Sequence, residues 1–338
     1  MSTLTSARLI LREIEMKALA LILCACAAAA GEAAELRLKQ TIVLPGVNGR
    51  IDHLAVDVRG ARLFVCALGN NTVEVVDLRK GGRVRSIGGL GAPQGAGYVP
   101  EPSRLYIAND KGGIVNIYDG QSFASLGKIA FEDDADNVRY DSSVKRIYVG
   151  FGSGGIGIVD AVNGKQIGSI RLSGHPEAFQ LMEKTPRMFV NVPAARQVAV
   201  VDRDKGEVVA TWKIGGASAN FPMALDESGR RLFIGCRTPA ELAVLDEDTG
   251  EMISHLEISG DADDLFYDAR RRLLYVVCGA GNIDVIEQLN ANAWRRAATI
   301  PTAAGARTGL FVREMNSLFV AVPRRGGQAA EIRRYEIQ

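Results

Sequence analysis

The sequence has none of the short motifs that would assign a reaction to it. There is no CxxCH for covalent haem, no HExxH, no GxSxG and no Walker loop. The acidic runs at 132–136 and 261–264 lack the spacing, the glycine and the glutamate of an EF-hand. These absences argue against covalent haem and the common hydrolase and nucleotide sites. The cofactor stays unknown, with a divalent cation left open.

The sequence also lacks an excess of charge of either sign. Its 40 Lys and Arg stand against 39 Asp and Glu, a formal net charge of +1. No stripe of basic residues interleaved with aromatics runs along the chain. Because proteins bind nucleic acid largely by neutralising phosphates with clustered cations, we expect no nucleic-acid partner.

Cysteine and aromatic residues are scarce. Aromatics make up 6% of the chain and glycine occupies 37 positions, which suits tight turns and a crowded centre of small side chains. Beyond residue 30 only Cys66, Cys236 and Cys278 remain, and an odd number cannot form a disulfide framework. We expect small buried hydrophobic residues here, with a single pair or a free thiol as alternatives.

No apolar run is long enough to span a membrane. The longest, from Ala18 to Gly31, falls short of the roughly 20 residues required. It follows Lys17 and ends in small residues, the pattern of a signal peptide at residues 1–30, with residues 1–15 as an upstream extension or a long n-region. We expect a periplasmic or secreted monomer; a lipoprotein anchor at Cys26 is the less favoured alternative.

A repeat organises the rest of the chain. Residues 63–77, LFVCALGNNTVEVVD, combine two runs of strand formers with a turn of residues that tolerate positive φ, which predicts a hairpin. Weakened copies follow at intervals of 41 to 44 residues, marked by an aromatic anchor at Phe64, Tyr106, Tyr148, Phe189, Phe233, Tyr275 and Phe319. A period near 42 with about four strand-like runs predicts an all-β, seven-bladed propeller.

The two ends of the chain are expected to share one blade. The last repeat holds three strand-like runs, 309–312, 317–322 and 331–337, whereas the strand-like run 36–44 has no partner nearby in the sequence. Pairing run 36–44 with run 331–337 would complete the seventh blade and remove an exposed edge. Residues 31–338 are therefore expected to form a single propeller domain.

Six acidic residues follow the anchors by 12 or 13 positions, several of them just before a glycine-containing turn. We interpret them as turn formers whose carboxylates accept hydrogen bonds from nearby backbone N–H groups. They are Asp77, Asp119, Asp160, Asp202, Asp246 and Glu287.

The anchor strands resemble a known family. The stretches FVCALGNNTVEVVD and LYIAND are similar to the YVTN repeat of secreted bacterial β-propellers, the YncE-like family, and the likeness extends over about residues 36–338. The resemblance implies an exported, seven-bladed, WD40-like propeller without a settled enzymatic activity. The YVTN letters themselves are degraded in every copy.

Candidate site residues emerge from counting backwards from each anchor. A constant offset of twelve residues places one position of every repeat at the same level, at the start of the innermost strand, and four of these seven positions are acidic. Clustered carboxylates repel one another, so arginines such as Arg139, Arg237 and Arg307, a cation or a basic ligand should compensate. The expected channel-mouth residues are Asp52, His53, Gln94, Asp136, Asn137, His175, Glu177, Asp263, Asp264 and Arg307.

Three functional hypotheses fit this pattern. The first is an exported, non-enzymatic binding or scaffold protein whose acid-rich channel mouth holds a small molecule, a cation or a partner protein. The alternative is a periplasmic metal-dependent hydrolase or dehydrogenase subunit in which the rim acids, with His53 or His175, bind a metal or act as general base. The third is a protein–protein platform that uses the outer strands or the opposite face.

Overall fold

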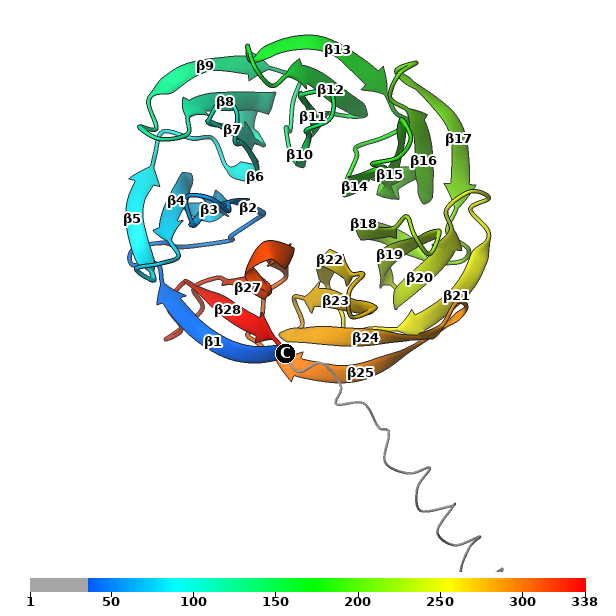
Figure 1. The fold of residues 1–338 in the computed structure, drawn as a ribbon. Helices are drawn as coiled ribbons and strands as arrows, with labels where there is room; N and C mark the ends of the chain where they lie inside the picture. Colours follow the sequence, from blue (N-terminus) through cyan, green and yellow to red (C-terminus); the bar gives the residue numbers. More distant parts are fainter. Residues whose placement is uncertain (1–35) are drawn as a thin grey trace, which may run out of the picture. The chain divides into compact units, whose positions relative to one another are not determined.

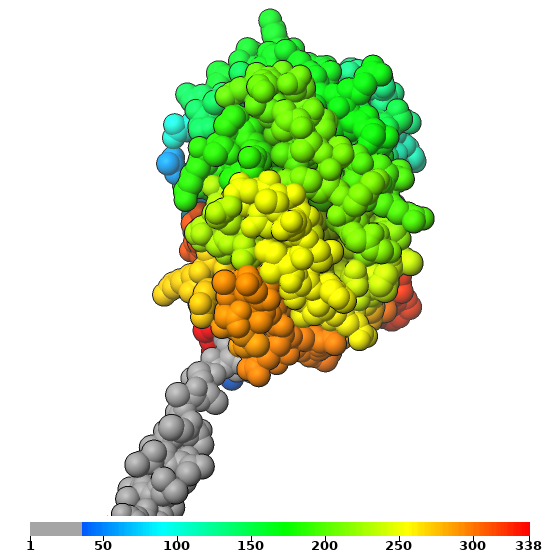
Figure 2. All heavy atoms as spheres, turned by 90° about the vertical axis from the view of Figure 1, so that its right-hand side faces the viewer, coloured from blue at the N-terminus to red at the C-terminus, as the bar shows by residue number. Residues whose placement is uncertain are grey.

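A computed structural model describes residues 36–338, which form an all-β ring (Figure 1). Seven four-stranded antiparallel sheets surround one axis, as the seven-anchor repeat predicts. Blades 1 to 6 run consecutively from β2–β5 to β22–β25, and Figure 2 shows successive blades side by side in sequence order, from green to orange. The predicted signal peptide and Cys26 lie outside the described residues.

The strands of each blade follow one another from the axis outward. The innermost strands are β2 (Leu54–Asp57), β6 (Pro93–Val99), β10 (Val138–Asp141), β14 (Phe179–Leu181), β18 (Ser218–Asp226), β22 (Ala262–Asp268) and β26 (Thr308–Val312). The second strands are β3 (Arg62–Ala67), β7 (Arg104–Asn109), β11 (Arg146–Phe151), β15 (Arg187–Val192), β19 (Arg231–Thr238), β23 (Leu273–Cys278) and β27 (Ser317–Val322).

The third strands carry the turn acids, and the outer strands close each blade. The third strands are β4 (Thr72–Asp77), β8 (Ile114–Asp119), β12 (Gly155–Asp160), β16 (Gln197–Asp202), β20 (Ala240–Asp246), β24 (Asn282–Asn290) and β28 (Glu331–Ile337). The outer strands are β5 (Gly82–Ile87), β9 (Ser125–Ala130), β13 (Lys165–Arg171), β17 (Glu207–Lys213), β21 (Met252–Glu257), β25 (Ala293–Pro301) and β1 (Leu36–Val43). Three single-turn 3-10 helices join second to third strands: η1 (Leu68–Asn70), η2 (Lys111–Gly113) and η3 (Pro193–Ala195). A fourth, η4 (Arg313–Met315), joins the first and second strands of blade 7.

The ring closes as the sequence predicts. Strand β1 pairs antiparallel with β28, with Ile42 opposite Ile332, and gives the seventh blade the order β1-β28-β27-β26. Both isoleucines are buried, and the backbone N–H of Leu44 extends the contact by donating to the Ala330 carbonyl at 2.8 Å. Closure therefore joins the two ends of the described chain through backbone hydrogen bonds and a shared core.

The cores lie between blades rather than within them. All seven anchor aromatics are fully buried. One cluster joins Phe319 and Ile332 of blade 7 to Leu63 and Val65 of blade 1, and similar clusters join each following pair as far as blades 5 and 6. Between blades 6 and 7 the rings of Tyr275 and Phe311 pack with their centroids 5.6 Å apart. Because each blade buries its faces against its neighbours, a single blade would expose most of its apolar surface.

The turn acids behave as predicted in five repeats. Asp246, for example, accepts hydrogen bonds from the backbone N–H groups of Asp248 and Thr249, each at 3.0 Å. The same arrangement occurs at Asp77, Asp119, Asp160 and Asp202. The prediction was wrong for Glu287, whose carboxylate pairs with Arg295, because the two lie opposite each other on the extended hairpin of β24 and β25.

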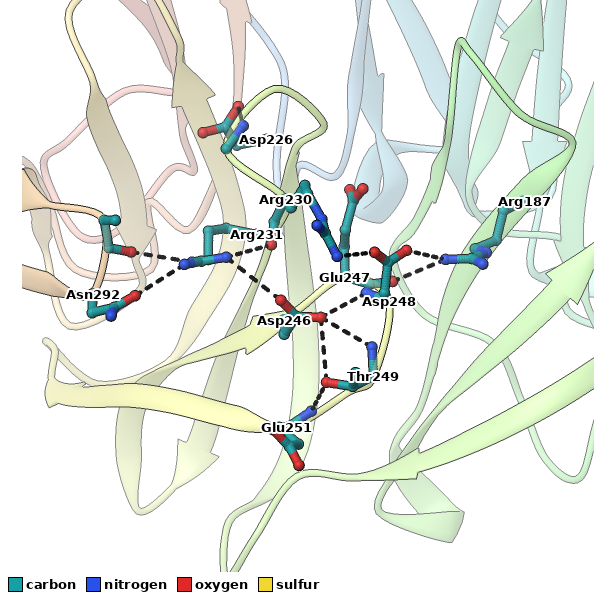
Figure 3. A network of polar contacts seen from close by, with 12 residues as sticks. Arg187, Asp226, Arg230, Arg231, Asp246, Glu247, Asp248, Thr249, Glu251 and Asn292 are labelled. Carbon is teal, nitrogen blue, oxygen red and sulfur yellow. Dashed lines mark hydrogen bonds and ion pairs between the residues drawn. The ribbon is translucent and has the colours of Figure 1, made fainter.

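These turns also connect neighbouring blades (Figure 3). Asp248 of blade 5 lies between two guanidinium groups, Arg187 of blade 4 at 3.0 Å and Arg230 of its own blade. Arg231 donates to the Asn292 side chain of blade 6 at 3.0 Å. This network lies at the end of the ring opposite the starts of the inner strands, and it serves packing between blades.

The structure also bears on the cysteines and on membrane-spanning segments. Cys66, Cys236 and Cys278 are buried free cysteines, which confirms the expectation of small hydrophobic residues. Among residues 36–338, no helix is long and apolar enough to cross a membrane.

Candidate functional site

The candidate site lies where the seven inner strands begin. At the predicted level, the N–H groups of Asp52, Asp136 and Glu177 donate to equivalent carbonyls of the adjacent second strands, at 2.7 to 3.0 Å. In blades 2 and 6 the equivalent residues, Gln94 and Asp263, occupy irregularities in strand pairing. β-bulges commonly redirect a side chain beside a functional site. We call the polar residues gathered here the rim cluster: Arg50, Asp52, His53, Gln94, Asp134, Asp136, His175, Glu177, Arg237, Asp261, Asp263, Asp264 and Arg307.

His53 connects blades 1 and 6. Its Nδ1 lies 3.5 Å from Asp264 Oδ2, and its Nε2 lies 3.9 Å from Asp52 Oδ1. Burial acts to lower the pKa of His53, but the negative charge of Asp264 and its hydrogen bond outweigh burial, and the pKa rises to about 10. His53 is therefore an imidazolium at neutral pH in this arrangement, and it would have to lose its proton before it could bind a metal or act as a general base.

Asp52 is the deepest acid of the cluster, with 1% of its surface exposed. Arg50 Nη2 lies 2.7 Å from its Oδ2. Burial raises the pKa of Asp52 to about 7, although His53 and Arg50 oppose this shift. The sequence-based expectation that at least one rim acid has a raised pKa is thus confirmed.

His175 makes the second histidine contact of the rim. Its Nδ1 lies 2.7 Å from the Gly152 carbonyl, so this nitrogen donates, and its Nε2 faces Asp136 Oδ2 at 3.9 Å. Burial acts to lower the pKa of His175, but the nearby Asp136 carboxylate and the Gly152 carbonyl raise it to about 9. The same contact holds the pKa of Asp136 below its usual range despite burial. Gln94 belongs to this side of the rim, where its Nε2 donates to Asp134 at 2.7 Å.

The remaining acids are paired with arginines. Arg307 Nε lies 3.0 Å from Asp263 Oδ2, and its Nη1 lies 3.1 Å from Asp261 Oδ1. Arg237 pairs with the other oxygen of Asp263 and stacks over the Phe221 ring, 3.8 Å from its centroid. Asp263 thus sits between two guanidinium groups, and the expected compensation of the acids by Arg237 and Arg307 is present.

Glu177 differs from its neighbours. Among the described residues, no cationic group lies within 4 Å of its carboxylate and no side chain donates a hydrogen bond to it. Burial raises the pKa of Glu177 to about 8, and the charge of Asp136 adds to this effect. Oδ1 of Asp136 is also buried without a hydrogen-bond partner in this part of the chain. Glu177 and Asp136 thus each offer a carboxylate oxygen that a donor could satisfy. Asp52 Oδ2 and Asp263 Oδ2 also lack a well-directed hydrogen bond, but each lies within 3.0 Å of an arginine nitrogen.

The offset argument found most of the cluster but missed part of it. The structure brings together Asp52, His53, Asp136, His175, Glu177, Asp263, Asp264 and Arg307. Asn137 is buried, and no contact joins its side chain to the rim acids. The sequence analysis missed Arg50 and Asp134, although both lie fourteen residues before an anchor, the offset of His175 and Asp261. Listing the residues at this second offset in every repeat would have identified both.

Metal binding was left open by the sequence. Among residues 36–338, no group of three or more His, Cys, Asp or Glu side chains is arranged to hold a metal ion. The two rim histidines face acids, and three of the seven rim carboxylates, Asp52, Asp261 and Asp263, face arginines.

Comparison with known proteins identifies the fold alone. No family model and no curated protein sequence matches this chain. A chain of the mitotic checkpoint complex superposes with a TM-score of 0.74 at 14% identity, over 91% of this chain and 94% of that one. The WD40 repeats of RRP9 superpose with a TM-score of 0.78 at 10% identity, over 90% of this chain and 100% of theirs. Both agree with a seven-bladed propeller; the resemblance to the YVTN-repeat family stays a prediction.

Proposed function

We propose that this protein is an exported, non-enzymatic binding propeller whose rim cluster holds a small ligand that carries a cationic hydrogen-bond donor, such as an amine. The observation that carries the proposal is the Glu177 carboxyl group, which has no cation within 4 Å while the neighbouring acids are paired. Because its pKa is about 8, Glu177 is largely protonated at neutral pH, and it would lose its proton when an ammonium group binds beside it. An ammonium group placed between Glu177 and the free Oδ1 of Asp136 would satisfy both.

The pairing of the other acids supports binding at a defined position. Arg237, Arg307 and Arg50 neutralise Asp263, Asp261 and Asp52, so these groups form a rigid frame rather than a diffuse acidic surface. A ligand would therefore meet one free carboxylate in a fixed setting, which favours recognition of a single cationic group over a highly charged partner. Export itself is an expectation from the sequence and forms part of this proposal.

The test measures melting temperature against putrescine, in the wild type, in Glu177→Gln and in the control Asp246→Asn. A ligand that binds the folded state raises the melting temperature with concentration. We expect the wild type and Asp246→Asn to respond equally and Glu177→Gln to lose at least tenfold in affinity. Equal responses in all three proteins, or no response in the wild type, would refute an amine site at Glu177.

The metal-dependent enzyme alternative has its own outcome in the same assay. A stabilisation by zinc or manganese that disappears in His175→Gln would favour it, because His175 faces Asp136 and could exchange that contact for a metal ion.

A further inference from the structure

A cavity lies between blades 3 and 4, and none of the residues that line it belongs to the rim cluster. Its volume is about 490 Å³, and it opens between β10 and β14 and the turns that follow them. Its walls include Arg139, Tyr140, Ser142, Gln180, Leu181 and Met182. This volume is within the range of small-molecule sites in proteins.

Arg139 is the unusual residue of this cavity. Its guanidinium donates to the Val138 carbonyl at 3.0 Å and lies 5.5 Å from the centroid of the Phe179 ring. Among the described residues, no carboxylate lies within 4 Å of it. Since a guanidinium has five N–H donors, most of those on Arg139 remain free in a largely enclosed position.

The two carboxylates that act electrostatically on Arg139 already have other partners. Asp136 and Asp264 act on Arg139 electrostatically, but Asp136 faces His175 and Asp264 faces His53. Burial lowers the pKa of Arg139 despite these two acids, so the surroundings do not fully replace the water that the cation has lost.

The other cation of the cavity wall, Arg203, already donates its hydrogen bonds to protein groups. Arg203 pairs with Asp141 and donates to the carbonyls of Thr185 and Pro186 at 2.7 and 3.2 Å. Asp141 in turn accepts a hydrogen bond from the Ser143 hydroxyl at 2.5 Å. These contacts leave Arg139 as the cation of this cavity wall without a carboxylate partner among the described residues. The exposed Glu183 also lines the cavity, so a bound anion has to lie at Arg139 and away from this carboxylate.

We propose that this cavity binds a small organic monocarboxylate, whose carboxylate pairs with Arg139 and whose apolar body lies against Leu181 and Met182. A planar guanidinium matches a carboxylate with two parallel hydrogen bonds. A single negative charge fits best, because one free cation cannot neutralise a phosphate dianion and Asp136 and Asp264 would repel it. The hydroxyls of Tyr140 and Ser142 line the same space and can add hydrogen bonds.

The experiment is calorimetric titration of the full protein with sodium benzoate, and separately with inorganic phosphate at the same ionic strength. The variants are Arg139→Gln and the control Arg171→Gln, which removes the same charge from the exposed face of the same blade. We expect benzoate to bind the wild type and the control equally and Arg139→Gln at least tenfold more weakly. Glu177→Gln should bind benzoate like the wild type, which separates this site from the rim cluster.

Three results would overturn the proposal: no benzoate binding by the wild type, equal binding by Arg139→Gln, or binding of phosphate in preference to benzoate.

If Arg139→Gln does not fold, Arg139→Lys provides the test. It keeps the charge but loses the planar fork, so benzoate should bind it several-fold more weakly, and unchanged affinity would refute the carboxylate contact. Without ligand, Arg139→Gln should melt at the same or a higher temperature, since it removes a half-buried cation that has no carboxylate partner; a large decrease would assign Arg139 a structural role instead.

Discussion

At the scale of single residues, the rim cluster is a set of partly buried acid–base pairs rather than an open acidic mouth. The sequence predicts clustered carboxylates and a need for compensation, and the structure supplies it through Arg50, Arg237, Arg307 and two imidazolium groups. What distinguishes one acid from the rest is the lack of a partner, and that property belongs to Glu177. We therefore place the proposed ligand at Glu177 rather than across the cluster as a whole.

The histidine pairs predict a pH dependence of stability. The folded-state pKa of His53, about 10, lies above its usual value of 6.5, so its contribution is complete below pH 6.5 and is lost as the pH rises to about 10. His53→Gln should therefore reduce the free energy of unfolding at pH 6 by about 1–3 kcal/mol, and the difference should vanish above pH 10.

Urea denaturation at pH 6, 8 and 10.5 measures this effect. His255→Gln is the control, because the His255 side chain is 69% exposed and should change stability little at any of these values. A difference between wild type and His53→Gln that is constant with pH would contradict the charged pair with Asp264.

At the scale of elements, β1 decides whether the ring is closed. Only Leu36 and Ile42 of this strand are buried, whereas Leu38 is 49% exposed, and a pairing irregularity between Leu38 and Gln40 interrupts the alternation of its side chains. Ile42 packs into the core shared with blade 1, and pairing with β28 satisfies the backbone of β1.

A matched pair of substitutions on this strand measures the closure. Ile42→Ala should destabilise the protein by about 2–4 kcal/mol, because it leaves a cavity in the core between blades 7 and 1. Leu38→Ala should change stability by no more than about 0.5 kcal/mol. Denaturant titration compares them, and similar small effects of both would mean that β1 contributes little to the closed ring.

At the scale of the whole domain, the cores between blades make the blades depend on one another. Each cluster draws on two neighbours, and strand β1 closes the circle, so the loss of one blade exposes apolar surface on the next. The ring should therefore behave as one unit even though it is built of repeats.

This arrangement predicts a single unfolding transition. In calorimetry, Ile42→Ala should move the whole transition to lower temperature without splitting it, and tryptophan fluorescence from Trp212 and Trp294 in blades 4 and 6 should change at the same temperature. Separate transitions for the fluorescence of blades 4 and 6 and for the total heat would show that the blades unfold independently.

The sequence by itself determined the repeat, the number of blades and the level of the candidate site. The anchor period of about 42 residues fixes seven equivalent units, and a constant offset from a buried anchor places equivalent residues at equivalent positions in every unit. The run 36–44 and the missing fourth strand of the last repeat likewise determined the closure, because an unpaired strand and an incomplete sheet satisfy each other.

Only the tertiary structure decided which side chains meet. Offsets within a repeat say nothing about contacts between blades, so the pairing of His53 with Asp264 from the other end of the chain was not readable, and neither was the solitary state of Glu177. The same holds for Arg139, which the sequence offered as compensation for the rim acids. Its direction depends on the packing of β10 against blade 4, and the guanidinium lies over Phe179 in a cavity between blades. Local sequence sets the position of a residue on its strand, whereas charges and cavities arise where two separately encoded surfaces come together.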